Sequence, residues 1–161
     1  MTSADRRTVT VERLIPAAAD LVFAVLVSPA DHVGLDGSGM LQGSSSTSEP
    51  LRLGVRFTMA MKQGPLRYRS VNEVTAFEPN RVLAWRTTGE WRGRSVVGGQ
   101  WWRFTLLPTE DGTLVRHSYE WGRAVYPRLT IQLPRYPQRM ARTMPVTLER
   151  LEQTVLARQG P

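Results

Sequence analysis

Apolar and polar residues alternate with a period of two through the middle of the chain, over Arg52–Trp121. Successive side chains of a β-strand point to opposite faces, so this period predicts a half-buried antiparallel sheet. Turn residues at Gln63-Gly64-Pro65 and Glu110-Asp111-Gly112 separate its runs. With a first strand over Arg7–Leu14 and a short one near Met40–Gly43, we expect about seven strands.

A second period, of three and four residues, appears near the end of the chain. It places five apolar residues on one stripe of an α-helix that extends from about Tyr136 to Arg158: Met140, Met144, Leu148, Leu151 and Val155. Pro145 lies within this helix, and an interior proline removes a backbone hydrogen bond. We therefore expect an irregular or kinked entry, with regular helix only from about Val146.

Two short helices are predicted between the first strand and the main sheet. Pro16 ends the strand, Ala17–Leu26 reads as one helix, and Pro29–Val33 reads as a second turn that Gly34 stops. The apolar stripe of the terminal helix needs a surface to bury against, and the sheet offers it. The simplest architecture is an α+β fold in which one curved antiparallel sheet folds around the terminal helix.

Composition limits the class of protein. A chain of 161 residues suits a single domain over residues 1–161, since domains cluster at about 100–150 residues. The chain has no cysteine, which excludes disulfides, thiolate metal ligands and a thiol nucleophile. It has no signal-peptide pattern and no run of roughly 20 apolar residues. We expect a cytoplasmic protein without a membrane span.

The charge balance is basic, with 21 Lys and Arg against 14 Asp and Glu, and every cation except Lys62 is arginine. A nucleic-acid surface needs clustered cations, and no arginine run here is longer than Arg6-Arg7. The pattern does not favour nucleic-acid binding, and the coding preference of a GC-rich genome explains the arginines equally well. A regulatory or interaction protein that uses a basic surface remains an alternative.

The order of one strand, two short helices, six strands and a long terminal helix resembles the helix-grip fold of the START and birch-pollen-allergen-like superfamily, SRPBCC. The resemblance covers nearly the whole chain. It rests on VTVERLIPAAADLVFAVLVSPADH at 9–32, YRSVNEVTAFEPNRVLAWR at 68–86, FTLLPTEDGTLVRHSYEW at 104–121 and LERLEQTV at 148–155. The polyketide cyclase/dehydrase-like branch is the most similar part of this superfamily.

The resemblance implies a cavity between the sheet and the terminal helix, which members use to hold lipids, polyketides or other apolar molecules. By strand parity and position on the helix, the following residues would line it and bind a ligand: Phe57, Met59, Met61, Tyr68, Asn72, Trp85, Trp102, His117, Tyr119, Met140 and Met144. Large apolar side chains with a few polar tips are typical of a small-molecule pocket. The alternative is that they form only a packed core.

His117 and Tyr119 are the candidates for proton transfer, because an imidazole titrates near neutral pH and strand parity directs both residues inward. A hydrogen-bonded core histidine is the competing interpretation. Buried polar residues need partners, so Asn72 and His117 predict a mutual network, an ordered water or a ligand. The resemblance carries no universal catalytic motif.

A metal site would need more ligands than the sequence brings together. His32 lies near Asp31 and Asp36, but one histidine and two loop carboxylates are a poor preorganised set. We therefore expect neither a metal ion nor a cofactor.

The leading hypothesis is binding of an apolar or aromatic small molecule, lipid- or polyketide-like, in the cavity between sheet and helix. The alternative in a different class is a cyclase- or dehydrase-like enzyme that uses the same cavity. Trp101 must face away from Trp102, because adjacent strand residues point to opposite sides. With Arg86 and Arg103 it would form either a homodimer patch or a stacked surface pair.

Overall fold

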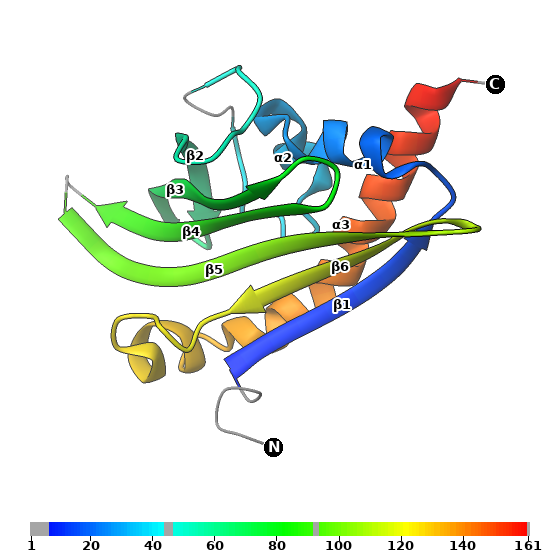
Figure 1. Ribbon diagram of the computed structural model, residues 1–161. Helices are drawn as coiled ribbons and strands as arrows, with labels where there is room; N and C mark the ends of the chain where they lie inside the picture. Colours follow the sequence, from blue (N-terminus) through cyan, green and yellow to red (C-terminus); the bar gives the residue numbers. More distant parts are fainter. Residues whose placement is uncertain (1–6, 44–46, 92–93, 161) are drawn as a thin grey trace.

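The computed structural model describes residues 7–43, 47–91 and 94–160. The elements in chain order are β1 (Thr8–Ile15), α1 (Ala19–Leu26), the 3₁₀ turn η2 (Pro29–Asp31), α2 (His32–Leu35), β2 (Arg56–Gln63), β3 (Leu66–Glu78), β4 (Val82–Trp91), β5 (Arg94–Thr109), β6 (Gly112–Glu120), the π-helix η3 (Arg128–Gln132) and α3 (Tyr136–Gln159). The predicted α+β class, with an antiparallel sheet and a long C-terminal helix, is confirmed (Figure 1).

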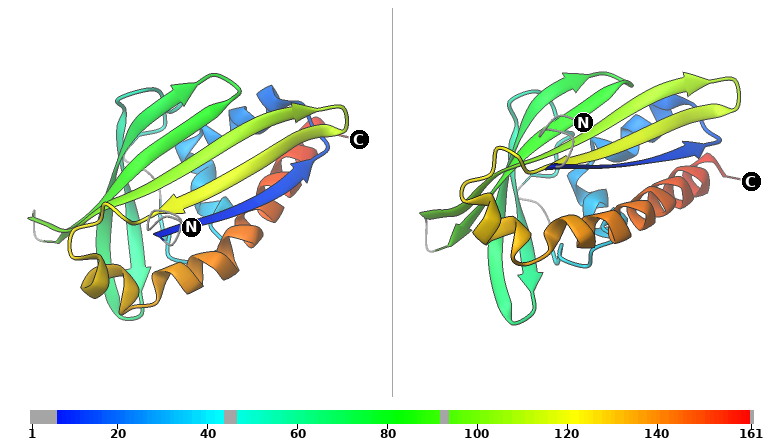
Figure 2. Two further views of the ribbon diagram at one scale, coloured as in Figure 1. Left: turned by 60° about the horizontal axis from the view of Figure 1, so that its bottom comes forward. Right: turned by 90° about the horizontal axis from the view of Figure 1, so that it is seen from below.

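The strands form one antiparallel sheet of six strands in the order β1-β6-β5-β4-β3-β2, counted over the described residues. The strands from β2 to β6 follow one another as hairpins, whereas β1 pairs with β6 and brings the two ends of the sheet sequence together. Figure 2 shows the sheet curving around α3, with α1 and α2 on the same side. The sheet and these helices therefore enclose the interior between them.

The predicted strand near Met40–Gly43 is wrong, which is why the sheet has six strands rather than seven. This segment makes only an isolated bridge, between Leu41 and Met61. Its pairing with β2 is limited to two backbone hydrogen bonds, from Gln42 N–H to the Ala60 carbonyl and from Lys62 N–H to the Met40 carbonyl. The Leu41 backbone N–H donates instead to the Asp36 carboxylate, at 2.9 Å. Side-chain bonds of this kind compete with the strand ladder for backbone groups.

The α3 helix is continuous from Tyr136 through Pro145, so the expectation of regular helix only from Val146 is wrong. The irregular backbone lies before the helix, at Arg135, which has a left-handed φ of 59°. An interior proline costs roughly 3 kcal/mol. The buried Met140 and Met144, which precede it, offset that cost by packing this part of the helix onto the interior.

The apolar stripe of α3 is buried as predicted, and it divides between two clusters. Leu148, Leu151 and Val155 join the main core, while Met140 and Met144 join a second cluster towards the start of the helix. The opposite faces of α3 carry charge. No helix in the described ranges is both long and apolar enough to cross a membrane.

A β-bulge in β3 shifts the strand parity. In β3 the register changes between Val74 and Ala76, so Phe77, rather than Ala76, packs on the core. Its ring centroid lies 5.5 Å from that of Phe23. Simple alternation from Val74 would place Ala76 on the inner face, but a bulge adds one residue to one strand and reverses the alternation beyond it.

The pairing of β5 with β4 has two register shifts, and the one between Thr87 and Thr88 lies at Gly99. Gly99 has a φ of 86°, and a Cβ there would lie 2.4 Å from the Arg123 carbonyl oxygen, so only glycine fits. Gly98 and Gly99 lie within β5, which begins at Arg94, and Gly99 is the residue that the bulge adds to this strand.

Trp101 stacks with a different arginine from the two expected. The guanidinium of Arg123 lies 5.2 Å from the centroid of the Trp101 ring. Arg86 is its cross-strand neighbour in the register. Homodimer formation through this patch stays a prediction.

Candidate functional site

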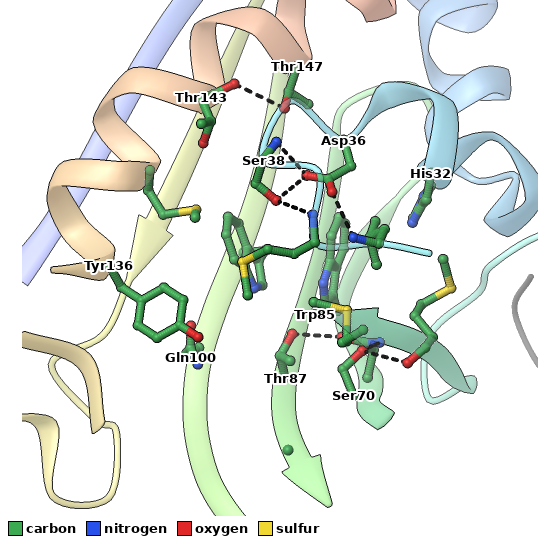
Figure 3. Close-up of a pocket in the computed structure, with 18 of the residues that line it drawn as sticks. His32, Asp36, Ser38, Ser70, Trp85, Thr87, Gln100, Tyr136, Thr143 and Thr147 are labelled. Carbon is green, nitrogen blue, oxygen red and sulfur yellow. Dashed lines mark hydrogen bonds between the residues drawn. The ribbon is translucent and has the colours of Figure 1, made fainter. Parts of the chain in front are cut away.

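A pocket of about 470 Å³ lies between the curved sheet, α3 and the loop that follows α2 (Figure 3). The described residues that line it are Leu26, His32, Leu35, Asp36, Ser38, Met40, Leu41, Phe57, Met59, Met61, Gln63, Leu66, Tyr68, Ser70, Asn72, Trp85, Thr87, Gly89, Gln100, Trp102, Phe104, His117, Thr130, Pro134, Tyr136, Met140, Thr143, Met144 and Thr147. The lining is mainly apolar, with polar groups at a few points. Core interiors are normally close-packed, so a space of this size sets the region apart.

The structure places every residue of the predicted set along this pocket except Tyr119. Tyr119 is fully buried behind Trp102, with ring centroids 4.5 Å apart. Its hydroxyl donates a hydrogen bond to Gln100 Oε1 at 2.8 Å, and Gln100 lines the pocket in its place. Strand parity correctly predicted that the Tyr119 side chain points inward. Parity alone could not show that the Trp102 ring lies between Tyr119 and the pocket.

Five rings from α2 and the sheet form a continuous row, which we call the aromatic row: His32, Trp85, Phe104, His117 and Trp102. Successive ring centroids lie 5.4, 5.9, 3.9 and 5.8 Å apart. All five residues line the pocket. Neighbouring rings stack on or tilt against one another, at interplanar angles of 26°, 32°, 10° and 32°, and together they give one wall of the pocket an apolar aromatic lining.

His117 is the most unusual polar residue of this wall. It is 4% exposed, and neither of its ring nitrogens has a hydrogen-bond partner among the described residues. Burial, with a smaller contribution from the nearby His32, lowers the pKa of His117 to about 3. The ring is therefore uncharged near neutral pH, where it is too weak a base to suit proton transfer.

His32 is also uncharged, but its hydrogen bonding is settled. Its Nε2 lies 2.8 Å from the Leu26 carbonyl oxygen, which can only accept, so Nε2 carries the proton. Burial lowers the pKa of His32 below its ordinary value. His32 thus hydrogen-bonds the carbonyl group of the last residue of α1 and contributes a neutral ring to the aromatic row.

The acidic residues near His32 have other partners. Asp31 accepts a hydrogen bond from the Arg158 guanidinium at 2.6 Å, and Asp36 accepts one from the Ser38 hydroxyl at 2.6 Å. Over residues 7–43, 47–91 and 94–160, no three His, Asp or Glu side chains gather in a way that could hold a metal ion.

Asn72 belongs to a network that does not include His117. Thr87 Oγ1 donates to Asn72 Oδ1 at 2.7 Å, and Asn72 Nδ2 donates to the Phe57 carbonyl and to Ser70 Oγ, both at 3.3 Å. The predicted alternative of a mutual Asn72–His117 network is therefore wrong. Cross-strand neighbours on β2 and β4 satisfy Asn72 locally, as the antiparallel register allows.

The loop after α2 closes the pocket against α3. The Gly37 backbone N–H donates to Thr147 Oγ1 at 3.0 Å. A Cβ at Gly37 would lie 2.4 Å from the Thr143 carbonyl oxygen, so the close approach requires glycine. In Figure 3, Asp36 and Ser38 lie beside Thr143 and Thr147 at this wall.

Two tyrosines join the β2–β3 hairpin to the start of α3. The Tyr136 hydroxyl donates a hydrogen bond to Gln63 Oε1 and forms a second hydrogen bond with the Tyr68 hydroxyl. Burial raises the pKa of Tyr68, and the neighbouring Tyr136 raises it further. Burial also raises the pKa of Tyr136. Both hydroxyls therefore stay protonated and neutral.

Several lining residues were not predicted as site residues. Thr143 and Thr147 each follow a stripe methionine by three residues, so helical spacing could have found them. Ser70 and Thr87 share the parity of Asn72 and could have been included on that ground. The Asp36 loop gave no sequence signal, because its position depends on contacts with a helix more than 100 residues away.

Together these features define an α+β protein in which a six-stranded antiparallel sheet and a long C-terminal helix enclose a mainly apolar pocket. No family model matches the chain. It is similar to the uncharacterized protein Rv0088 of Mycobacterium tuberculosis strain H37Rv, with 35% identity over 102 residues that cover 62% of this chain and 41% of the relative. The uncharacterized protein MT0096 of strain CDC 1551 is 38% identical over the same lengths. The chain thus spans less than half of these curated relatives.

Solved structures share the fold. A Mesorhizobium loti protein, MLL2253, has a TM-score of 0.68 at 24% identity, covering 96% of this chain and all of its own. A protein from Arthrobacter aurescens has a TM-score of 0.71 at 15% identity, covering 98% and 90%. The Aha1 dimer from Colwellia psychrerythraea has a TM-score of 0.61 at 16% identity, covering 92% and 95%. At these identities the likeness extends to the fold alone.

Proposed function

We propose that this protein binds an apolar or aromatic small molecule, lipid- or polyketide-like, in the pocket between the sheet and α3. One observation carries the proposal: the inward-facing aromatic rings and methionines surround a space of about 470 Å³ instead of filling it. Pockets of roughly 300–1,000 Å³ with apolar walls and few polar groups are the usual form of a small-molecule site.

We further propose that the chain is a helix-grip protein of the SRPBCC superfamily, of the polyketide cyclase/dehydrase-like branch. The order of its elements, the curvature of the sheet around α3 and the shared fold of the solved structures support this assignment. The pocket lies where the resemblance implies a cavity, between the sheet and the terminal helix.

The site favours binding over proton transfer. His117 is uncharged near neutral pH, and Tyr119 is withdrawn from the pocket with its hydroxyl engaged by Gln100. Burial also raises the pKa of Tyr119, so its hydroxyl keeps its proton. A cyclase-like activity in this pocket would have to rest on shape and orientation, which can direct a reaction without an acid–base pair.

A bulky substitution inside the pocket tests the proposed function. N-phenyl-1-naphthylamine, a neutral fluorophore that brightens in apolar surroundings, should bind the native protein with saturable stoichiometry. Thr87→Phe should weaken its binding by at least roughly tenfold, because a ring at this position occupies space that the ligand needs. Fluorescence titration measures both effects.

The adjacent residue provides a matched control. Thr88 is the next residue of β4, is half-buried like Thr87 and does not line the pocket. Thr88→Phe should leave fluorophore binding unchanged while placing the same side chain on the other face of the strand. Equal binding by both variants, at equal melting temperatures, would place the fluorophore elsewhere and contradict the proposal.

A further inference from the structure

Among the described residues that line the pocket, His117 is the one with buried side-chain polar atoms that lack a hydrogen-bond partner. A neutral imidazole has one N–H donor and one nitrogen acceptor. Both ring nitrogens of His117 are buried without a partner among the described residues, and the ring lines the pocket. Leaving such a buried group unsatisfied destabilises the protein, so a ligand that pairs with it would bind more tightly.

The orientation of His117 defines how a partner can approach. Phe104 covers one face of the ring at a centroid distance of 3.9 Å and an interplanar angle of 10°. Hydrogen bonds to imidazole nitrogens lie in the plane of the ring, so this stacking leaves the ring edge as the bonding site. The polar side chains of the same wall have other partners, since Gln100 accepts from Tyr119 and Asn72 accepts from Thr87.

The charge of the pocket limits the class of partner. No described arginine or lysine lines it, and Asp36 is the one carboxylate among the described lining residues. That carboxylate already accepts hydrogen bonds from Ser38 and from the Leu41 backbone. The Arg139 guanidinium donates to the Ser38 carbonyl oxygen at 2.7 Å but does not itself line the pocket. A carboxylate or phosphate buried against the aromatic row would therefore lack a contacting counter-charge, which is costly. An uncharged polar group avoids this cost.

We propose that the ligand is uncharged and presents a hydroxyl or carbonyl oxygen to the ring edge of His117, while its planar apolar part lies against the aromatic row. This inference rests on the proposed function and specifies the ligand class for that same pocket. A hydroxyl can serve either nitrogen of His117, and a carbonyl can serve the nitrogen that carries the proton.

A matched set of tricyclic compounds tests the inference by displacing N-phenyl-1-naphthylamine from the native protein and from His117→Phe. The set is 9-fluorenol, fluorene and 9-fluorenecarboxylate, which share a ring system and differ in one group. The affinity ratio of fluorenol to fluorene should fall about tenfold in His117→Phe, because that variant keeps an aromatic ring but removes both nitrogens. The carboxylate should displace the fluorophore least in the native protein.

A second readout does not depend on the variant. In native protein with ¹⁵N-labelled histidine, fluorenol should shift the ring-nitrogen resonances of His117, whereas fluorene should not change their hydrogen-bonding signature. An unchanged fluorenol-to-fluorene ratio, unmoved resonances, or no displacement by fluorenol would each overturn the inference while fluorophore binding still supports the pocket. Absence of fluorophore binding to the native protein would instead contradict the proposed function itself.

Discussion

Leu151→Ala should lower the free energy of unfolding by about 2–5 kcal/mol, the range found when a buried leucine is truncated. Leu151 belongs to the α3 stripe and has no exposed surface, and it lies in the main core cluster with Phe57 and Leu106. The substitution removes apolar contacts and leaves a space that the surrounding sheet cannot fully close. Equilibrium urea unfolding, followed by far-UV circular dichroism, measures the loss.

The same helix supplies the control. Leu156 is 37% exposed and lies off the buried stripe, so Leu156→Ala should cost less than about 1 kcal/mol. If the two variants lost equal stability, the assignment of Leu151 to the core face of α3 would be incorrect. The contrast tests the packing of α3 on the sheet, on which the pocket depends.

The second large expected effect is a loss of stability on acidification below about pH 6.5. Burial lowers the pKa of His117 to about 3 and also lowers that of His32, so the unfolded chain binds more protons than the folded chain in this window. The stabilising contribution is fully present above pH 6.5 and is lost as the pH falls towards 3. Within this window His117 contributes a slope of up to about 1.4 kcal/mol per pH unit, and His32 adds to the loss in the same direction.

His117→Phe isolates the contribution of one histidine. Between pH 6.5 and about pH 4.5, the native protein should lose roughly 2–3 kcal/mol more stability than this variant, which has no imidazole to protonate at position 117. Urea unfolding at a series of pH values measures the difference. Parallel stability–pH curves for the two proteins would contradict the uncharged, buried state of His117.

Periodicity predicted most of the fold. The period of two located the strands from β2 to β6, and the spacing of Met140 to Val155 located α3 with its buried face. Both signals arise because burial on one face repeats regularly along an element. Local deviations were not predictable in this way. The bulge before Phe77 reverses parity within a strand, and Pro145 is accommodated because packing of the preceding turns outweighs its local cost.

The pocket was predictable as far as strand parity and helix position extend. They placed Trp85, Trp102 and His117 on its wall, but parity could not show that Tyr119 lies behind Trp102. The loop around Asp36 was not predictable, because its position depends on hydrogen bonds to α3 that connect distant parts of the chain. The missing partner of His117 likewise becomes visible only when every neighbouring group is placed in space.

The most direct test of the central claim is native mass spectrometry of the protein after incubation with the lipid-soluble extract of its host cells. The account predicts a one-to-one adduct with an uncharged small molecule, which denaturation releases. The Thr87→Phe variant should retain much less of this molecule. A native protein that takes up no molecule from the extract, while remaining folded, would contradict the claim that the pocket is a binding site.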